Sequence, residues 1–357
     1  MAVPQQGEPT EAEAAGISKR QAKRLAKAAA AAGSGASSSS AAGGPSSGSA
    51  STKVKSTPTP APAPDAEWDA AAFEASSVHA VYDAIAPHFS STRHSPWPLI
   101  PRFLAGMPPG ALGADVGCGN GKYMRTRGDA ALLGVDRSEP LVRLARDNHE
   151  PAAPRNGVAV GDALASGLRH GAFDYAISIA TIHHLSTPAR RAESVRELVR
   201  LVRPLPQGHV ASDAEALGAP GRFLIFVWAL EQRGQERRRF DEQGREEAST
   251  ASKAADSAPA EDDMQWRKDQ DLLVPWVMQQ PSQPPAATDE GKGRNPPDRT
   301  DDAPVYQRYY HVFREGELEA LVDDAAQTMP AVEVQRHASG WERGNWWGVW
   351  DVREAAR

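Results

Sequence analysis

Cysteine is almost absent from this chain of 357 residues, in which Cys118 is the single thiol. One thiol excludes a disulfide scaffold and a cysteine-rich zinc site. Long apolar runs are also lacking, so we expect neither a membrane-spanning helix nor the apolar core of a signal peptide. Positive charge is not in excess, because the formal net charge is −6 and gives no global basic field for nucleic acid. We therefore expect a soluble protein of the cytoplasm, and leave residence in the nucleus open.

Two spans contain too few apolar residues to build a hydrophobic core. Residues 1–66 are rich in alanine, serine, glycine and proline, and residues 233–303 are polar, charged and rich in proline. Such compositions are typical of disordered segments. We predict a disordered low-complexity tail at 1–66, a folded core at 67–232, a mostly disordered insertion at 233–303 and the rest of the same domain at 304–357. An apolar segment near 269–278 is expected to dock on the core.

The remaining sequence alternates short apolar strands with helical stretches. Five strands are predicted by the segments LGADVGCG, LLGVDRS, VAVGDAL, FDYAISIATIHHL and GRFLIFVWAL. The last of these is apolar almost throughout, as expected of a strand covered on both faces. A terminal pair of strands is predicted by the segments AVEVQRHASGW and NWWGVWDV. Strand–helix alternation of this kind predicts an α/β fold with a mostly parallel sheet and a terminal antiparallel strand.

Two helices flank these strands in the sequence. The segment Phe73–Phe89 predicts a helix that ends at the Ala86–Pro87 step, because the residue before a proline avoids the helical conformation. The segment RYYHVFREGELEALVDDA predicts a second helix near the C-terminus. Its apolar face is formed by Leu318, Leu321, Val322 and Ala325.

A glycine-rich cluster follows the first predicted strand. Asp115 is followed by Gly117, Gly119 and Gly121, and then by a helical stretch. Glycine lets the backbone turn sharply and approach a ligand closely, and free N–H groups at the start of a helix favour polar or anionic ligand atoms. The cluster indicates a nucleotide site, although a glycine pattern alone is weak evidence.

Two further carboxylates follow the next predicted strands. Asp136 closes the second strand at the spacing from the first glycine that recognition of ribose hydroxyls requires. Asp162 follows the third strand, where it would accept a hydrogen bond from an adenine amino group. Together with Asp115, these residues would meet at the carboxyl edge of the sheet, where α/β proteins bind ligands.

The spacing favours S-adenosylmethionine (AdoMet) over a dinucleotide without excluding the latter. A dinucleotide site requires G-x-G-x-x-G, but here the third glycine comes one residue early and Lys122 follows it. Asp115 also suits the amino group of a methionine moiety. The residues assigned to the AdoMet site are Asp115, Gly117, Cys118, Gly119, Asn120, Gly121, Asp136, Arg137, Asp162, Ala163 and Ala180.

Several segments resemble a known enzyme family. DVGCGNGKY, GVDRS, GDAL and ISIATIHHLST are similar to class I AdoMet-dependent methyltransferases. More specific similarity is found in the segments VYDAIAPHFSSTRHSPWP, WALEQ, DLLVPWV, RYYHVFREGEL and NWWGVW. These resemble the eukaryotic tRNA wobble-uridine carboxymethyl methyltransferases, which include stand-alone fungal-type enzymes and the methyltransferase domain of AlkB-homologue fusion proteins.

The resemblance implies a Rossmann-like domain that transfers a methyl group from AdoMet to the carboxylate of 5-carboxymethyluridine at tRNA position 34, giving the methyl ester. It also implies two partners, the anticodon loop of tRNA and a small zinc-binding activator subunit that forms a heterodimer with the methyltransferase. It implies no membrane association, and no metal site is assigned to this chain.

Methyl transfer to a carboxylate needs no general base, because a carboxylic acid is ionised at neutral pH. The protein must instead align the carboxylate oxygen, the methyl carbon and the sulfonium sulfur. A dense cationic pocket would stabilise the charged ground state more than the transition state, so we expect one or two directional donors. The candidates for this role are Tyr82, Arg93, His183 and His184. Their competing interpretations are a structural hydrogen bond for a histidine and a surface salt bridge for Arg93.

A third group of residues is predicted to contact the RNA substrate. It consists of Arg308, Tyr309, His311, Asn345, Trp346 and Trp347. Aromatic faces hold unstacked bases well, and arginine and histidine add a basic surface. The competing interpretation of the tryptophans is a terminal strand that packs them into the core.

Two other functions remain open on the sequence alone. One is a class I methyltransferase that acts on a small-molecule carboxylate or hydroxyl, which the mild acidity of the chain favours. The other is a non-catalytic RNA-binding subunit that keeps a vestigial fold, which the intact glycine-rich cluster opposes.

Overall fold

The computed structural model describes residues 58–64, 68–91, 97–149, 156–208, 216–232, 270–278 and 304–356, all within one compact unit, Lys55–Arg357. Its helices are α3 (Ala70–Glu74), η1 (Ala75–His79), α4 (Ala80–Ser91), α5 (Leu99–Ala105), α6 (Glu139–His149), η2 (Ile182–His184), α7 (Pro188–Leu201) and α9 (Glu317–Gln327). Its strands are β1 (Thr59–Pro60), β2 (Leu112–Val116), β3 (Ala131–Asp136), β4 (Gly157–Val160), β5 (Tyr175–Ile179), β6 (Arg222–Trp228), β7 (Asp271–Val277), β8 (Val305–His311), β9 (Val332–Glu342) and β10 (Asn345–Glu354). None of the described helices is long and apolar enough to cross a membrane.

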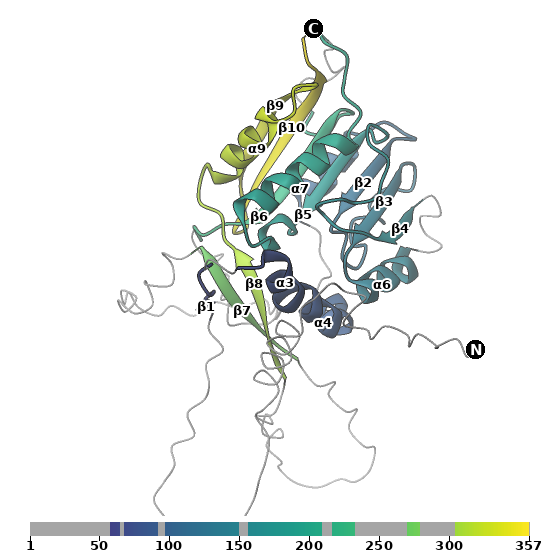
Figure 1. Ribbon diagram of the computed structural model, residues 1–357. Coiled ribbons are helices and arrows are strands. Elements are labelled where there is room, and N and C mark those ends of the chain that lie inside the picture. The colour runs from purple at the N-terminus through teal and green to yellow at the C-terminus, as the bar shows by residue number, and fades with distance from the viewer. Residues whose placement is uncertain are drawn as a thin grey trace, which may run out of the picture. The chain divides into compact units, whose positions relative to one another are not determined.

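The larger sheet has the strand order β4-β3-β2-β5-β6-β10-β9. From β4 to β6 every neighbouring pair is parallel, whereas β10 runs antiparallel to both β6 and β9. Helices α7 and α9 lie side by side over one face of this sheet (Figure 1). The arrangement confirms the predicted α/β class, the mostly parallel sheet and the terminal antiparallel strands.

Strand β6 shows how the core is divided between the two faces of the sheet. Phe223, Ile225 and Val227 belong to the cluster that includes α7 and α9. Leu224 and Phe226 alternate with them and belong to the cluster that includes α5. Since successive side chains of a strand point to opposite faces, the continuous apolar run of β6 fills both clusters, as predicted.

A second sheet has three strands in the order β1-β7-β8, and the sequence predicts it only in part. The docking segment near 269–278 is β7, which pairs antiparallel with β8. The helix predicted over RYYHVFREGELEALVDDA is wrong in its first part, because Arg308–His311 belongs to β8 and α9 begins at Glu317. Aromatic residues favour a strand where a partner strand is available, and the helical stripe begins only at Leu318.

The predicted boundary of the N-terminal tail also needs correction. Strand β1 lies within the span 1–66 and pairs antiparallel with β7, with Thr59 opposite Leu273 and Pro60 opposite Leu272. Proline-rich segments can join a sheet at its edge, where a missing N–H group breaks no ladder on the outer side.

The first predicted helix is longer than the sequence suggests. It is formed by α3, η1 and α4 in succession, and the Ala86–Pro87 step does not end it, because α4 continues to Ser91. Pro87 is exposed, so its ring disturbs no packing, while Val81 and Ile85 remain buried. The helix therefore loses a backbone hydrogen bond but keeps its apolar contacts.

Candidate active site

Backbone conformation and nearby atoms explain the glycines in the loop after β2. Gly117 has φ 84°, and a Cβ atom there would lie 2.0 Å from the Thr181 hydroxyl oxygen. Gly119 has φ 55°, and the nearest atom to a Cβ there would be a ring carbon of Phe89 at 3.8 Å. Gly117 therefore permits contact with the segment after β5, whereas Gly119 leaves space beside the loop that a ligand can enter.

Asp136 stands at the carboxyl end of β3 and holds the loop in place. Its Oδ2 accepts a hydrogen bond from the backbone N–H of Gly119 at 2.9 Å, and its Oδ1 accepts one from Ser138 at 2.9 Å. Burial raises the pKa of Asp136 above its ordinary value, and the two backbone donors oppose that rise. The carboxylate is thus fixed at the position predicted for ribose recognition.

Asp115 is the clearest sign that a ligand belongs in this loop. Its carboxyl group is buried, and neither oxygen has a hydrogen-bond partner among the residues that the structure describes. Burial, together with the charge of Asp136, raises the pKa of Asp115 to about 8. An unpaired buried carboxyl group suits a cationic ligand group, and the amino group of AdoMet fits this requirement.

The acidic residue after β4 has a partner already. Asp162 forms an ion pair with Arg137 and accepts a hydrogen bond from the backbone N–H of Leu164 at 2.9 Å. Both Asp162 and Arg137 were assigned to the AdoMet site from the sequence, and the structure brings them together beside Ala163. Asn120 of the glycine-rich loop donates from Nδ2 to the hydroxyl of Ser90 at 3.0 Å, which ties the loop to α4.

Ala180, at the end of β5, has a strained backbone. Its φ of 58° lies in the left-handed region that alanine rarely adopts, and its N–H donates to the carbonyl of Phe226 at 2.9 Å. The following residue, Thr181, contacts Gly117. Strained residues are typical of ligand sites, and this one joins the glycine-rich loop to η2.

The two histidines of η2 are buried and have different roles. His184 Nδ1 lies 2.8 Å from the Tyr309 carbonyl oxygen, so we assign the proton to Nδ1. In the neutral ring, Nε2 then accepts a hydrogen bond from the Tyr82 hydroxyl at 2.8 Å. His183 Nδ1 instead accepts from the backbone N–H of Trp228 at 3.1 Å. His184 therefore orients Tyr82, whereas His183 fastens η2 to β6.

Arg308 of β8 lies in a cage of aromatic rings next to these residues. Its side chain is 3% exposed, and its Nε and Nη1 atoms have no hydrogen-bond partner among the described residues. The centre of the guanidinium group lies 4.5 Å from the ring centroid of Trp276, 5.3 Å from that of Tyr310 and 5.9 Å from that of Tyr82. Trp276 and Tyr310 were missed by the sequence analysis, because only strand pairing brings them together.

The predicted RNA contact at the end of β8 is wrong for Tyr309 and His311, because both are buried and hydrogen-bonded within the protein. Tyr309 donates to Asp271, and His311 lies between Asp271, at 2.9 Å, and Glu317, at 2.7 Å. Side chains alternate along a strand, so Tyr309 and His311 point away from the side of Arg308. Among the three residues predicted here, Arg308 alone faces the site.

The predicted base-stacking role of β10 is also wrong for Asn345 and Trp346. Asn345 is fully buried and donates from Nδ2 to the carbonyls of Glu342 and Arg343 in the turn before β10. Trp346 is 6% exposed in the cluster that includes α7 and α9, and Trp347 packs against the opposite cluster. Side chains from both faces of β10 thus pack into hydrophobic clusters, and the competing interpretation of a packed terminal strand holds. Arg93 lies outside the described residues.

Comparison with known proteins names the fold and the family. Residues 114–205 match the Methyltransferase domain family. The tRNA (carboxymethyluridine(34)-5-O)-methyltransferase of Schizosaccharomyces pombe is 37% identical over 278 residues, which cover 78% of this chain and 96% of that protein. The enzyme of the same name from Saccharomyces cerevisiae is 35% identical over 321 residues, which cover 78% of this chain and 97% of that protein. The chain belongs to this family. AdoMet is accordingly the cofactor, and its amino group suits the buried carboxyl group of Asp115, which has no hydrogen-bond partner among the described residues.

Other members of the tRNA (carboxymethyluridine(34)-5-O)-methyltransferase family are larger. The member from Xenopus tropicalis, alkbh8, is 40% identical over 288 residues, and these cover 78% of this chain but 41% of that protein. Similarity to solved structures is weaker. The complex between the Haloferax volcanii Trm112 methyltransferase activator and the putative methyltransferase has 23% identity and a TM-score of 0.33, over 42% of this chain and 60% of that chain. The family assignment therefore rests on the sequence relatives.

Proposed function

We propose that this protein transfers a methyl group from AdoMet to the carboxylate of 5-carboxymethyluridine at tRNA position 34, giving the methyl ester. The observation that carries the proposal is the 37% identity that extends over 96% of the S. pombe enzyme of that activity. The site supports it, because the described residues combine a glycine-rich cofactor loop with a buried cation and a tyrosine hydroxyl.

The chemistry requires little proton transfer. The substrate carboxylate is already ionised, and its oxygen attacks the methyl carbon of the sulfonium. The new C–O bond forms as the S–C bond breaks, and the electron pair of that bond goes to sulfur, which becomes a neutral thioether. AdoMet supplies the electrophilic methyl group, so the protein's own residues need only bind, orient and exclude water.

Each part of the site has a task in this scheme. The backbone at Gly117 and Gly119 approaches the cofactor, Asp136 meets its ribose, and Asp115 holds its amino group. Tyr82 is held by its hydrogen bond to His184 at 2.8 Å and places its ring beside the Arg308 guanidinium on the substrate side. No described residue has to act as a base, which agrees with the fact that both histidines are engaged in fixed hydrogen bonds.

The direct test is methylation of tRNA by the purified protein. We expect labelled AdoMet to label 5-carboxymethyluridine in tRNA, with the activator subunit present, and mild base to release the label as methanol, as hydrolysis of a methyl ester requires. Label in a small carboxylic acid but never in that nucleoside would favour the small-molecule alternative. If calorimetry with the activator present showed no AdoMet binding, the non-catalytic alternative would be favoured.

We also propose that the small zinc-binding activator subunit pairs with the edge of the larger sheet at β4. Strand β4 is an outer strand, and Val160 on it is 56% exposed, so both backbone groups and apolar surface are available. We expect Val160→Asp to weaken co-purification of the activator. The matched control is Val305→Asp on β8 of the other sheet, where the valine is 49% exposed. Equal retention of the activator by both variants would refute the placement.

A further inference from the structure

We propose that Arg308 is the receptor for the substrate's carboxylate group, which deepens the function proposed above and rests on it. The Arg308 guanidinium lies among the rings of Trp276, Tyr310 and Tyr82. Arg308 lies on β8 and is only 3% exposed. Its Nε and Nη1 atoms have no hydrogen-bond partner among the described residues. Arginine stays protonated at every physiological pH, so this is a permanent buried charge.

A buried charge of this kind calls for an anion. Leaving an ion unpaired in the protein interior is costly, and the three aromatic rings recover only a part of that cost through cation–π contact. None of the described carboxylates forms an ion pair with Arg308. The missing partner must therefore come from outside the described part of the chain, and an anionic substrate group fits.

Contacts between side chains connect the cage to the cofactor loop. The Phe89 ring, which is the atom group nearest to a Cβ at Gly119, lies 5.5 Å from the ring of Tyr82 and 6.1 Å from that of Trp276. Both of these rings also contact the Arg308 guanidinium. Phe89 therefore connects the cofactor loop to two of the rings that surround the unpartnered cation.

The other arginines near the loop and η2 are already engaged. Arg137 pairs with Asp162, Arg190 pairs with Glu74 at 2.7 Å, and Arg191 donates to the Leu185 carbonyl at 3.0 Å. Among these described arginines, Arg308 is thus the one with side-chain N–H groups that have no hydrogen-bond partner among the described residues.

A single arginine in an aromatic cage also suits the reaction. Its charge is delocalised over a planar group and shared with ring faces, so it orients the carboxylate without binding it as tightly as a cluster of cations would. Methyl transfer removes the negative charge, and the product ester then offers Arg308 only a neutral acceptor oxygen. The same residue that recognises the acid would therefore release the ester.

The inference predicts selectivity for charge that a structural arginine would not provide. The probes are two anticodon stem-loops that differ at position 34, one carrying 5-carboxymethyluridine and the other its neutral amide, each tested with the activator-bound protein. For the unaltered protein we expect the acid to bind about 10- to 100-fold more tightly than the amide, as a charge-assisted hydrogen bond requires. For Arg308→Met we expect affinity for the acid to fall to that for the amide, while affinity for the amide and for AdoMet stays unchanged.

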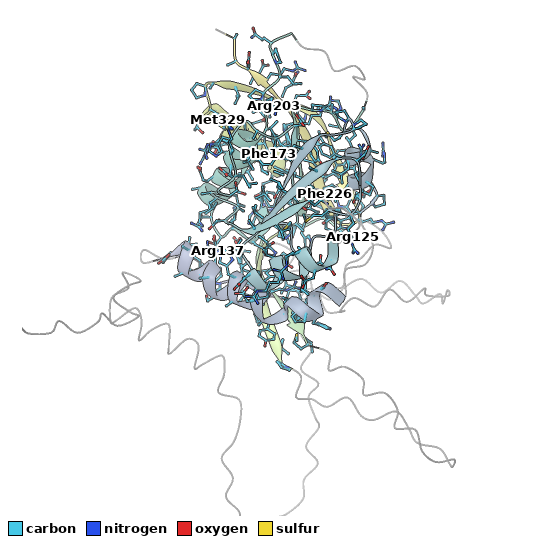
Figure 2. All side chains as sticks on the ribbon, turned by 90° about the vertical axis from the view of Figure 1, so that its right-hand side faces the viewer. Arg125, Arg137, Phe173, Arg203, Phe226 and Met329 are labelled. Carbon is cyan, nitrogen blue, oxygen red and sulfur yellow. The ribbon has the colours of Figure 1, made fainter. Side chains whose placement is uncertain are left out.

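Two further variants make the test independent of folding. Arg308→Lys keeps the charge and should restore part of the preference for the acid. The matched control is Arg203→Met, because Arg203 is exposed, pairs with Asp174 before β5 and lies at the end of the unit opposite Arg137 (Figure 2). It should keep the full preference. Arg308→Met should also raise the thermal unfolding temperature of the ligand-free protein, since it removes an unpaired buried charge.

The possible outcomes separate the inference from the function on which it rests. If the unaltered protein methylates the acid but Arg308→Met keeps its preference for the acid over the amide, the inference alone fails. It also fails if Arg308→Met loses AdoMet affinity and keeps the preference, because Arg308 then holds the cofactor's carboxylate. If the unaltered protein never methylates the acid in tRNA, the proposed function fails and the inference with it.

Discussion

The buried carboxyl group of Asp115 makes AdoMet binding depend on pH in a way that can be measured. Burial and the charge of Asp136 raise the pKa of Asp115 to about 8, so the ligand-free protein carries a neutral carboxylic acid there at pH 6.5. The cationic amino group of AdoMet requires the ionised form. At 1.5 pH units below the pKa, more than about nine-tenths of the sites are protonated, and binding should release about one proton per AdoMet.

The size of the effect follows from the same shift. AdoMet affinity should rise by about tenfold per pH unit between pH 6 and pH 8, then level off, because the α-amino group of the ligand loses its own proton near pH 7.7–8.0, roughly the value for free α-amines. Stability should change in the opposite direction. Because the folded-state pKa of Asp115 lies above its unfolded value, the ligand-free protein should lose stability as the pH rises from about 4 to about 8, by at most about 6 kcal/mol.

Isothermal calorimetry in two buffers of different ionisation enthalpy measures the protons released. Asp115→Asn is the comparison, since it keeps the shape of the side chain and removes the titration. We expect release of about one proton at pH 6.5 for the unaltered protein and none for the variant. Equal release by both proteins, or no release by either, would show that Asp115 does not hold the amino group.

Three other predictions test different parts of the structure. Gly117→Ala should lower the unfolding temperature and abolish AdoMet binding, because its Cβ would lie 2.0 Å from a threonine hydroxyl. The control is Gly110→Ala, at the similar φ of 82° but with no atom within 4 Å of the added Cβ, which should lower the unfolding temperature only through backbone strain. Tyr82→Phe should lower the single-turnover rate constant about 5- to 10-fold and leave AdoMet affinity intact, since it removes the hydrogen bond to His184 that orients the ring beside Arg308; an unchanged rate constant would exclude that role. Burial alone would raise the pKa of Glu317, but hydrogen bonds from His311 and the backbone lower it overall, so its ionised form stabilises the fold above pH 4–5 and this contribution disappears on acidification. Glu317→Gln should therefore reduce the free energy of unfolding by about 1–2 kcal/mol at pH 7 and by nothing near pH 3, measured by urea titration.

The cofactor half of the site could be predicted from the sequence because its signals are local. Apolar strands, the glycine-rich cluster and carboxylates at strand ends each occupy a few consecutive residues, and the parallel sheet order brings Asp115 and Asp136 together as predicted. The ion pair between Asp162 and Arg137 was not predicted, although both residues were assigned to the site.

The substrate half could not be predicted in the same way, because it depends on strand pairing over a long sequence separation. Trp276 of β7 and Arg308 of β8 meet only because β7 and β8 pair in a register that places Val274 opposite Arg308. The same reason explains the errors at the C-terminus. A tryptophan on an uncovered face of a strand would be exposed, but Trp346 packs into the cluster that includes α7 and α9 and is therefore buried.

The pairing of β7 with β8 has a consequence for how the chain can be cut and altered. Their register is fixed from Asp271 opposite His311 to Val277 opposite Val305, so hydrogen bonds hold the two strands to each other independently of the covalent link between them. Loop closure depends only weakly on length. Cleavage of the chain between residues 279 and 303, or a change in the length of that stretch, should therefore preserve the contact between Arg308 and Trp276. After cleavage, the two fragments should elute together in gel filtration until a denaturant separates them.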